Sequence, residues 1–265
     1  MRRSSVLAAG LLAAAAAPAF GQERGYCPAR PGLGTTPCTI DTGRVSVEVG
    51  LIDWQRDDAP DGRADDIAVA ATNLRIGLTH RLEAIVAWTP YARTRFRGAR
   101  GQVDVSGGVG DVTLGAKGNL LHPDGSGLSL AVMPFVSLPV GRVPIGSSRV
   151  DPGIALPFSY ALAPGLSLQA TPQVDVATDV DGSGRHAAYT ILGGLGWTIA
   201  GGVSLTGELI VQRDDDPGGR TTQRLGSVAL AWLAQDDLQF DAGAVLGLDR
   251  AAPDVRLYAG VARRF

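Results

Sequence analysis

Apolar side chains fall on every second position along most of this chain, and no other feature constrains the fold as strongly. From residue 43 to the end, the sequence divides into alternating segments of about ten residues, the length of a strand that crosses a bilayer. A period of two is typical of a β-strand with two unlike faces. We therefore expect an all-β protein. The clearest segment places on one face Leu166, Leu168, Ala170, Pro172, Val174 and Val176.

The connections between these segments alternate in length. Short joins such as His80-Arg81 and Gly201-Gly202 alternate with longer polar joins such as 54–65, 97–107 and 140–151. Short turns at one end and long loops at the other are typical of transmembrane barrels, whose short turns are periplasmic. We predict an antiparallel up-and-down transmembrane β-barrel over residues 43–265. Its strands, about twelve, are expected near 43–53, 66–78, 82–96, 109–120, 127–139, 153–162, 166–178, 187–199, 203–213, 221–234, 238–248 and 254–265.

A soluble β-sandwich or lipocalin-like barrel would also alternate, because periodicity does not say which face is buried. Two features favour the membrane barrel. The hairpins form one continuous array, and the last segment alternates up to a terminal Phe265. Such an ending resembles the signal read by the barrel-assembly machinery, although Arg263 stands where that signal usually has an apolar residue. The assembly machinery and outer-membrane lipid are therefore the expected partners.

The first residues have the order of a secretory signal peptide. Arg2 and Arg3 precede an apolar run from Val6 to Phe20, and Ala19-Phe20-Gly21 provides small residues before a cleavage point. The run is shorter than the roughly 20 residues of a spanning helix, so a retained anchor is the weaker alternative. We expect residues 1–21 to be removed on export.

Residues 22–42 form a Pro- and Gly-rich segment that contains the two cysteines of the chain, Cys27 and Cys38. An exported chain meets an oxidising compartment, so we predict a Cys27–Cys38 disulfide in a periplasmic N-terminal segment. Two free thiols are the alternative. A zinc site is disfavoured, because no histidine lies near enough to complete four ligands.

The charged residues argue against a nucleic-acid partner and indicate a polar interior. A net charge of -2 and a pI near 5.9 provide no basic surface for nucleic acid. If the apolar faces contact lipid, charged residues of both signs face the interior. They fill a polar lumen with ion pairs and water, or form a constriction that selects solutes. The candidate pore-lining residues are Arg44, Glu48, Asp111, Lys117, Asp175, Glu208, Arg224, Asp241 and Arg256.

The sequence offers no catalytic, cofactor or metal site. The three histidines, His80, His122 and His186, lie at expected turns or loop ends, and no Ser/His/Asp arrangement, nucleophile elbow or phosphate loop is present. The acidic runs at 57–58 and 214–216 are more typical of solvated loops than of cation sites. We therefore expect a protein without enzymatic activity, and an outer-membrane hydrolase is the remote alternative.

Three short stretches resemble the outer-membrane transporter family named for the meta-pathway of phenol degradation. Residues 108–117 (GVGDVTLGAK) are similar to its Gly-Phe-Gly-Asp-x-x-Leu-Gly-x-Lys motif, residues 73–83 to the strand-turn-strand before it, and Leu138-Pro139-Val140-Gly141 to its Leu-Pro-Thr-Gly. The resemblance implies an outer-membrane barrel that passes small, aromatic or hydrophobic solutes. A non-conducting structural or adhesion barrel, which binds partners through its loops, is the alternative.

Overall fold

The structure is a computed structural model that describes residues 23–147 and 149–265; the expected signal peptide at 1–21 lies outside them. Within the described ranges, no helix is long and apolar enough to span a bilayer. All regular structure is β. The strands are β1 (Val45–Ala59), β2 (Gly62–Thr79), β3 (Leu82–Trp88), β4 (Tyr91–Gly98), β5 (Val103–Gly108), β6 (Val112–Leu121), β7 (Leu128–Leu138), β8 (Asp151–Ala155), β9 (Phe158–Ala163), β10 (Leu166–Thr178), β11 (Arg185–Ala200), β12 (Val203–Asp214), β13 (Thr221–Gln235), β14 (Leu238–Gly247) and β15 (Val255–Arg264).

These fifteen segments form the twelve strands of the barrel wall, as predicted. β3 and β4 both pair with β2 and are separated at Thr89-Pro90, while β8 and β9 both pair with β7 and β10 and are separated at Leu156-Pro157. Proline has no N–H for the ladder, and the pairing is interrupted at Pro90 and Pro157. β5 and β6 are one wall strand that is interrupted at residues 109–111.

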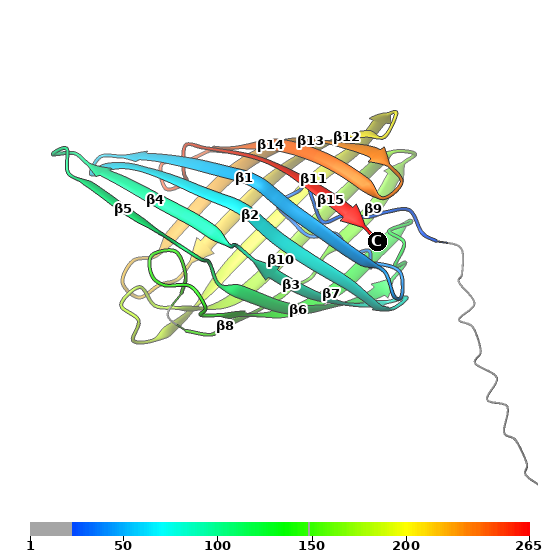
Figure 1. Ribbon diagram of the computed structural model, residues 1–265, viewed down its shortest axis with the longest axis horizontal. Helices are drawn as coiled ribbons and strands as arrows, with labels where there is room; N and C mark the ends of the chain where they lie inside the picture. The colour runs from blue at the N-terminus through cyan, green and yellow to red at the C-terminus, as the bar shows by residue number, and fades with distance from the viewer. Residues whose placement is uncertain (1–22, 148) are drawn as a thin grey trace, which may run out of the picture.

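Antiparallel pairing of β1 with both β2 and β15 closes the barrel (Figure 1). Short turns, among them Gly201-Gly202, gather at the end of the barrel where the C-terminus lies. Both of these glycines have positive φ (58° and 78°), which is the conformation that a two-residue hairpin requires. The other end carries the long connections.

The apolar phase of each strand is on the outside. Leu195, Leu209 and Trp232 are large apolar side chains that are about half or more exposed. The opposite phase holds buried polar groups, among them Glu48, Arg75 and Lys117. A barrel that is apolar outside and polar inside is suited to lipid and not to water. The register thus removes the soluble alternatives that periodicity alone left open.

Two connections differ from the expected loops. The sequence predicted polar loops at 54–65 and 97–107, but β1, β2, β4 and β5 continue through much of these ranges as hairpins beyond the rest of the barrel. Pairing persists because opposite charges stand across from one another: Arg56 lies opposite Asp65 and forms an ion pair with it. Alternating charged residues can therefore continue a strand above the membrane.

Candidate functional site

The N-terminal segment enters the barrel at the end with the short turns. A Cys27–Cys38 disulfide, as predicted, closes residues 27–38 into a loop, which we call the plug loop. Its backbone and side chains contact inward residues of strands around the wall. These wall residues are Glu48 of β1, Arg75 of β2, Lys117 of β6, Thr171 of β10, Glu208 of β12, Asp241 of β14 and Tyr258 of β15.

Glu48 and Arg75 hold the first half of the plug loop. The Glu48 carboxylate, which is 1% exposed, accepts hydrogen bonds from the backbone N–H groups of Ala29 and Arg30 at 3.0 to 3.1 Å. Arg75 pairs with Glu48 at 3.1 Å and donates to the carbonyl oxygens of both Cys27 (2.8 Å) and Cys38 (3.1 Å). One guanidinium thus ties the two ends of the loop to the wall.

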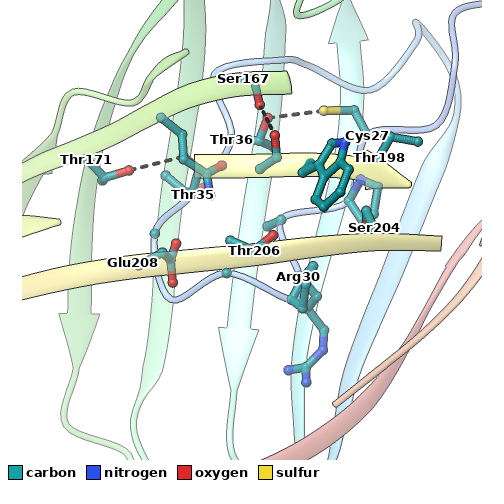
Figure 2. Close-up of a pocket in the computed structure, with 18 of the residues that line it drawn as sticks. Cys27, Arg30, Thr35, Thr36, Ser167, Thr171, Thr198, Ser204, Thr206 and Glu208 are labelled. Carbon is teal, nitrogen blue, oxygen red and sulfur yellow. Dashed lines mark hydrogen bonds between the residues drawn. The ribbon is translucent and has the colours of Figure 1, made fainter. Parts of the chain in front are cut away.

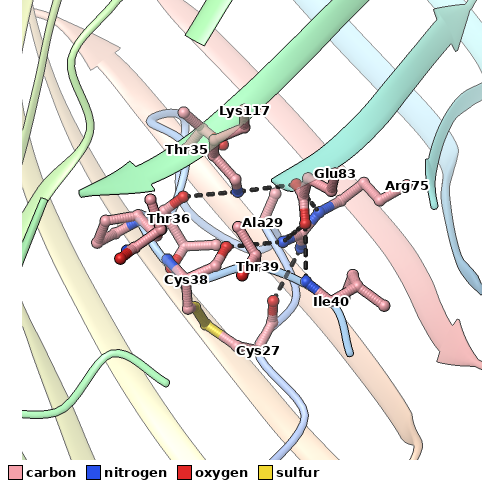
Figure 3. A network of polar contacts seen from close by, with 12 residues as sticks. Cys27, Ala29, Thr35, Thr36, Cys38, Thr39, Ile40, Arg75, Glu83 and Lys117 are labelled. Carbon is pink, nitrogen blue, oxygen red and sulfur yellow. Dashed lines mark hydrogen bonds and ion pairs between the residues drawn. A yellow bond between two sulfur atoms is a disulfide. The ribbon is translucent and has the colours of Figure 1, made fainter. Parts of the chain in front are cut away.

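Glu83 and Lys117 extend the same network (Figure 3). Glu83 pairs with Arg75 at 2.8 Å and with Lys117 at 3.0 Å, and it accepts a hydrogen bond from the backbone N–H of Ile40 at 2.8 Å. Lys117 also donates to the carbonyl oxygen of Thr36 at 2.8 Å. Buried charges are costly unless they are paired and hydrogen-bonded, and these groups meet both conditions.

The opposite wall holds the other side of the loop. Arg30 forms a bidentate pair with Asp241 at 2.7 to 3.1 Å and lies over the ring of Tyr258. Glu208 accepts a hydrogen bond from the N–H of Leu33 at 3.0 Å, and Figure 2 shows Glu208 beside the loop. Irregular backbone at membrane depth is tolerated only where protein or water satisfies its polar groups. Here the lumen side chains satisfy them.

Tyr26 directly precedes the plug loop, at the end of the barrel with the short turns. Its hydroxyl shares a hydrogen bond with Ser46 at 2.7 Å, and the Arg264 guanidinium lies over its ring. Burial raises the pKa of the Tyr26 hydroxyl well above its ordinary value, so the group stays neutral.

Two cavities are lined by several residues of the plug loop. The outer cavity, of about 360 Å³, has an apolar wall formed by Leu33, Ile85, Ala87, Met133, Phe135 and Leu192. The inner cavity, of about 370 Å³, lies toward the short turns and is lined by Gly165, Ser204 and Glu208 among others. Both are lined by Gly34, Thr171 and Leu192. A Cβ on Gly34 would stand 2.9 Å from atoms of both Thr171 and Leu192, so the loop meets the wall closely here.

One polar atom of the outer cavity has no partner. Asn73 lines this cavity, and within the described residues its buried Oδ1 accepts no hydrogen bond. Buried acceptors are almost always satisfied by protein, by water or by a ligand. Asn73 thus brings to the cavity lining an acceptor that no described group satisfies.

Most candidate pore-lining residues lie on the inward phase, in three settings. Glu48, Lys117, Glu208 and Asp241 contact the N-terminal segment. Asp175 and Arg256 lie nearer the long loops, where Asp175 accepts from Gln173 and Arg256 pairs with Asp53. Asp111 accepts hydrogen bonds from the backbone N–H groups of Gly141 and Ser147, and so anchors the loop between β7 and β8.

Two candidates occupy different places. Arg44 precedes β1 in an exposed turn and pairs with Glu23. Arg224 stands opposite the outward residue Val211, so its side chain belongs to the outer phase of β13, and it pairs with Asp249 in the following loop. The segment 221–225 has polar residues on both phases. Charge alone therefore gave the wrong face for Arg224.

Arg75, Glu83 and Arg30 complete the network and are not among the residues predicted from the sequence. Arg75 and Glu83 lie in the stretch 73–83 and Lys117 ends the motif at 108–117, so two separate stretches meet at one ion-pair cluster. Gly141 and Asp111 likewise join the Leu-Pro-x-Gly stretch to the same motif. The phase of the strands would have revealed Arg75 and Glu83. No local pattern marks Arg30.

The histidines make no triad in the described part of the chain. His122 shares a hydrogen bond with the carbonyl oxygen of Leu128, and His186 pairs with Asp179 at 2.8 Å. The side chains of Asp179, His186 and Asp216 meet at the long-loop end, where one ligand atom from each lies within 4.8 Å of the other two. These groups hydrogen-bond among themselves and to loop backbone.

Residues 29–265 match the family described as "Putative MetA-pathway of phenol degradation". The chain belongs to this family. The match begins inside the plug loop and runs to the last strand. A comparison with curated proteins finds no match.

Solved structures share the fold at low sequence identity. The porin NanC is 10% identical, with a TM-score of 0.52, over 83% of this chain and 98% of its own. The translocator domain of the autotransporter NalP from Neisseria meningitidis is 11% identical, with a TM-score of 0.52, over 84% of this chain and 89% of its own. The CymD monoaromatic hydrocarbon channel is 7% identical, with a TM-score of 0.50, over 85% and 88%. The fold is that of an outer-membrane β-barrel.

Proposed function

We propose that this protein is a passive outer-membrane channel for small, partly apolar solutes, and that the plug loop narrows its periplasmic end. The observation that carries the proposal is the apolar outer cavity beside the loop, with the unpartnered Asn73 Oδ1 in its lining. Apolar walls with a few polar groups are typical of small-molecule sites. The shared fold of the CymD monoaromatic hydrocarbon channel supports the same solute class. The proposal assigns the chain no catalysis.

Membrane insertion in this proposal depends on the last strand. β15 pairs with β1 and β14, and Phe265 at its end is exposed on the barrel surface. An exposed terminal aromatic on an edge-closing strand is a suitable recognition element for the barrel-assembly machinery. Outer-membrane lipid then surrounds the apolar phase.

A non-conducting barrel is the second candidate, and the plug loop itself favours it. The loop spans the lumen between opposite walls, from Glu48 to Glu208. Liposome swelling and planar-bilayer conductance separate the two functions. We expect the folded protein to admit small osmolytes and to carry discrete ion currents. A folded, heat-modifiable barrel that does neither would favour the structural function.

The solute class is tested by current block. We expect catechol, a small neutral aromatic with hydroxyl donors, to reduce the ion current in a saturable way. Asn73→Leu removes the free acceptor and should weaken the block about fivefold, which is the effect of one lost hydrogen bond. Thr72→Leu, on the adjacent outward position of β2, is the matched control and should leave the block unchanged. Equal block in all three proteins would remove Asn73 from the binding site.

A further inference from the structure

The outer surface of the long β1–β2 and β4–β5 hairpins carries a concentration of arginines that the channel does not use. We call Arg56, Arg63, Arg93, Arg95 and Arg97 the arginine face. Register places them together: Arg95 is opposite Asp65, which is opposite Arg56, and Arg97 is opposite Arg63. The chain as a whole has a net charge of -2, so this positive charge is local.

The arginine face belongs to the outside of the barrel. Arg93, Arg95 and Arg97 follow Tyr91 at alternate positions of β4, and Tyr91 is 48% exposed in the outward phase. On the neighbouring β5, Val105 and Val103 stand opposite Arg95 and Arg97 and are also exposed. The lumen phase of the same strand holds Thr94 and Phe96 instead. These arginines therefore do not contribute to the pore.

The face is only partly neutralised. Asp65 pairs with both Arg56 (3.4 Å) and Arg63 (2.9 Å). Within residues 23–147 and 149–265, no carboxylate lies within ion-pair distance of Arg93, Arg95 or Arg97. Asp58 is the second aspartate of this surface, opposite Arg63. The arginine face thus has five guanidinium groups and two carboxylates. The guanidinium groups of Arg93, Arg95 and Arg97 are the three that have no carboxylate partner among the described residues.

The position of the arginine face relative to the membrane indicates which anion it can bind. The hairpins lie at the end opposite the short turns, which is the outer-leaflet side of the membrane (Figure 1). Directly below the arginines is a row of exposed apolar residues, Ile52, Val69 and Tyr91. A strand rises about 3.3 Å per residue, so Arg93 lies roughly 7 Å above Tyr91 along β4 and Arg97 lies roughly 20 Å above it. An amphipathic occupant would place its chains on the apolar row and its anionic head on the arginines.

We propose that the arginine face binds the phosphorylated glycolipid of the outer leaflet. Its phosphate groups would accept bidentate hydrogen bonds from Arg93, Arg95 and Arg97, because a guanidinium presents paired donors that match phosphate geometry. Its acyl chains would pack on Val69 and Tyr91. Arg56, which lies over the Trp54 ring at 4.9 Å, adds charge at the edge of the site.

The test measures lipid retention by the purified full-length barrel, independently of transport. The protein is reconstituted in phosphatidylcholine vesicles with a minor fraction of lipid A, extracted into mild detergent, washed, and assayed for retained lipid A by mass spectrometry. We expect the wild-type barrel to retain lipid A. The triple variant Arg93→Gln, Arg95→Gln, Arg97→Gln should retain roughly a hundredfold less, since each surface arginine contributes about 1 kcal/mol.

A control variant and a control lipid test whether retention depends on these arginines and on the phosphate groups. The variant Arg142→Gln, Arg149→Gln, Arg220→Gln makes the same charge change on exposed loop arginines at the same end of the barrel and should retain lipid A as the wild type does. Dephosphorylated lipid A should not be retained. Equal retention by the two triple variants, or retention of the dephosphorylated lipid, would overturn the proposal. Heat-modifiable migration verifies folding, and Arg95→Gln alone replaces the triple variant if that variant does not fold.

Discussion

At the scale of single residues, the lumen is held by charges that water does not reach. Glu83 is fully buried and accepts from Arg75, Lys117 and the N–H of Ile40. Glu83→Gln leaves two buried cations without their shared carboxylate. We expect the free energy of unfolding to fall by about 3 kcal/mol, the usual effect of breaking a buried pair. Urea titration of the barrel in lipid vesicles, followed by tryptophan fluorescence, measures this change.

The matched control removes a carboxylate that faces solvent. Glu23 pairs with Arg44, and both side chains are nearly half exposed. Glu23→Gln should therefore change the free energy of unfolding by less than about 1 kcal/mol. If both substitutions shift the urea midpoint equally, burial does not set the strength of the Glu83 network.

At the scale of elements, the plug loop depends on its disulfide. The loop has no regular structure of its own, and the Cys27–Cys38 bond limits the conformations it adopts when it leaves the wall. Such a bond contributes about 3 kcal/mol for a loop of this size. The double variant Cys27→Ser, Cys38→Ser should therefore release the loop more often. We expect larger and more frequent current steps in planar bilayers.

Reductant provides the control for the disulfide experiment. Added thiol should convert wild-type currents toward those of the double serine variant, and it should leave the variant itself unaffected. Identical currents in the oxidised wild type and the variant would show that wall contacts alone hold the loop.

The strands could be predicted from the sequence, and the plug loop could not. Alternation along 166–176 reports which side of a strand faces lipid, because lipid imposes one apolar face on every strand. Alternation gave the wrong face for Arg224, which lies beyond the part of β13 that lipid surrounds. It also predicted a loop at 54–65, where cross-strand charge pairs continue the hairpin. The contact of Arg30 with Asp241 joins residues 211 positions apart, and no local period encodes such a pair.

At the scale of the whole molecule, the plug loop also masks the charge of the lumen. Four wall carboxylates, Glu48, Glu83, Glu208 and Asp241, accept hydrogen bonds from the N-terminal segment. Three wall cations, Arg75, Lys117 and Arg264, donate to it, and Arg264 is already paired with a further carboxylate, Asp237. Arg30 neutralises Asp241 directly. A barrel that lacks the segment would therefore expose an excess of negative charge along its pore.

Deletion of residues 23–42 should accordingly produce a wider, cation-selective channel. In a KCl gradient we expect the reversal potential to move toward the cation value, because rings of carboxylates favour cations in a pore. The same deletion with Glu208→Gln and Asp241→Asn should lose most of this selectivity while keeping the larger current. A deletion variant that migrates as a folded barrel but conducts like the wild type would mean that the loop does not limit flow. A large but unselective current would mean that the wall carboxylates bind protons or cations once the loop is gone, and so do not set the field in the pore.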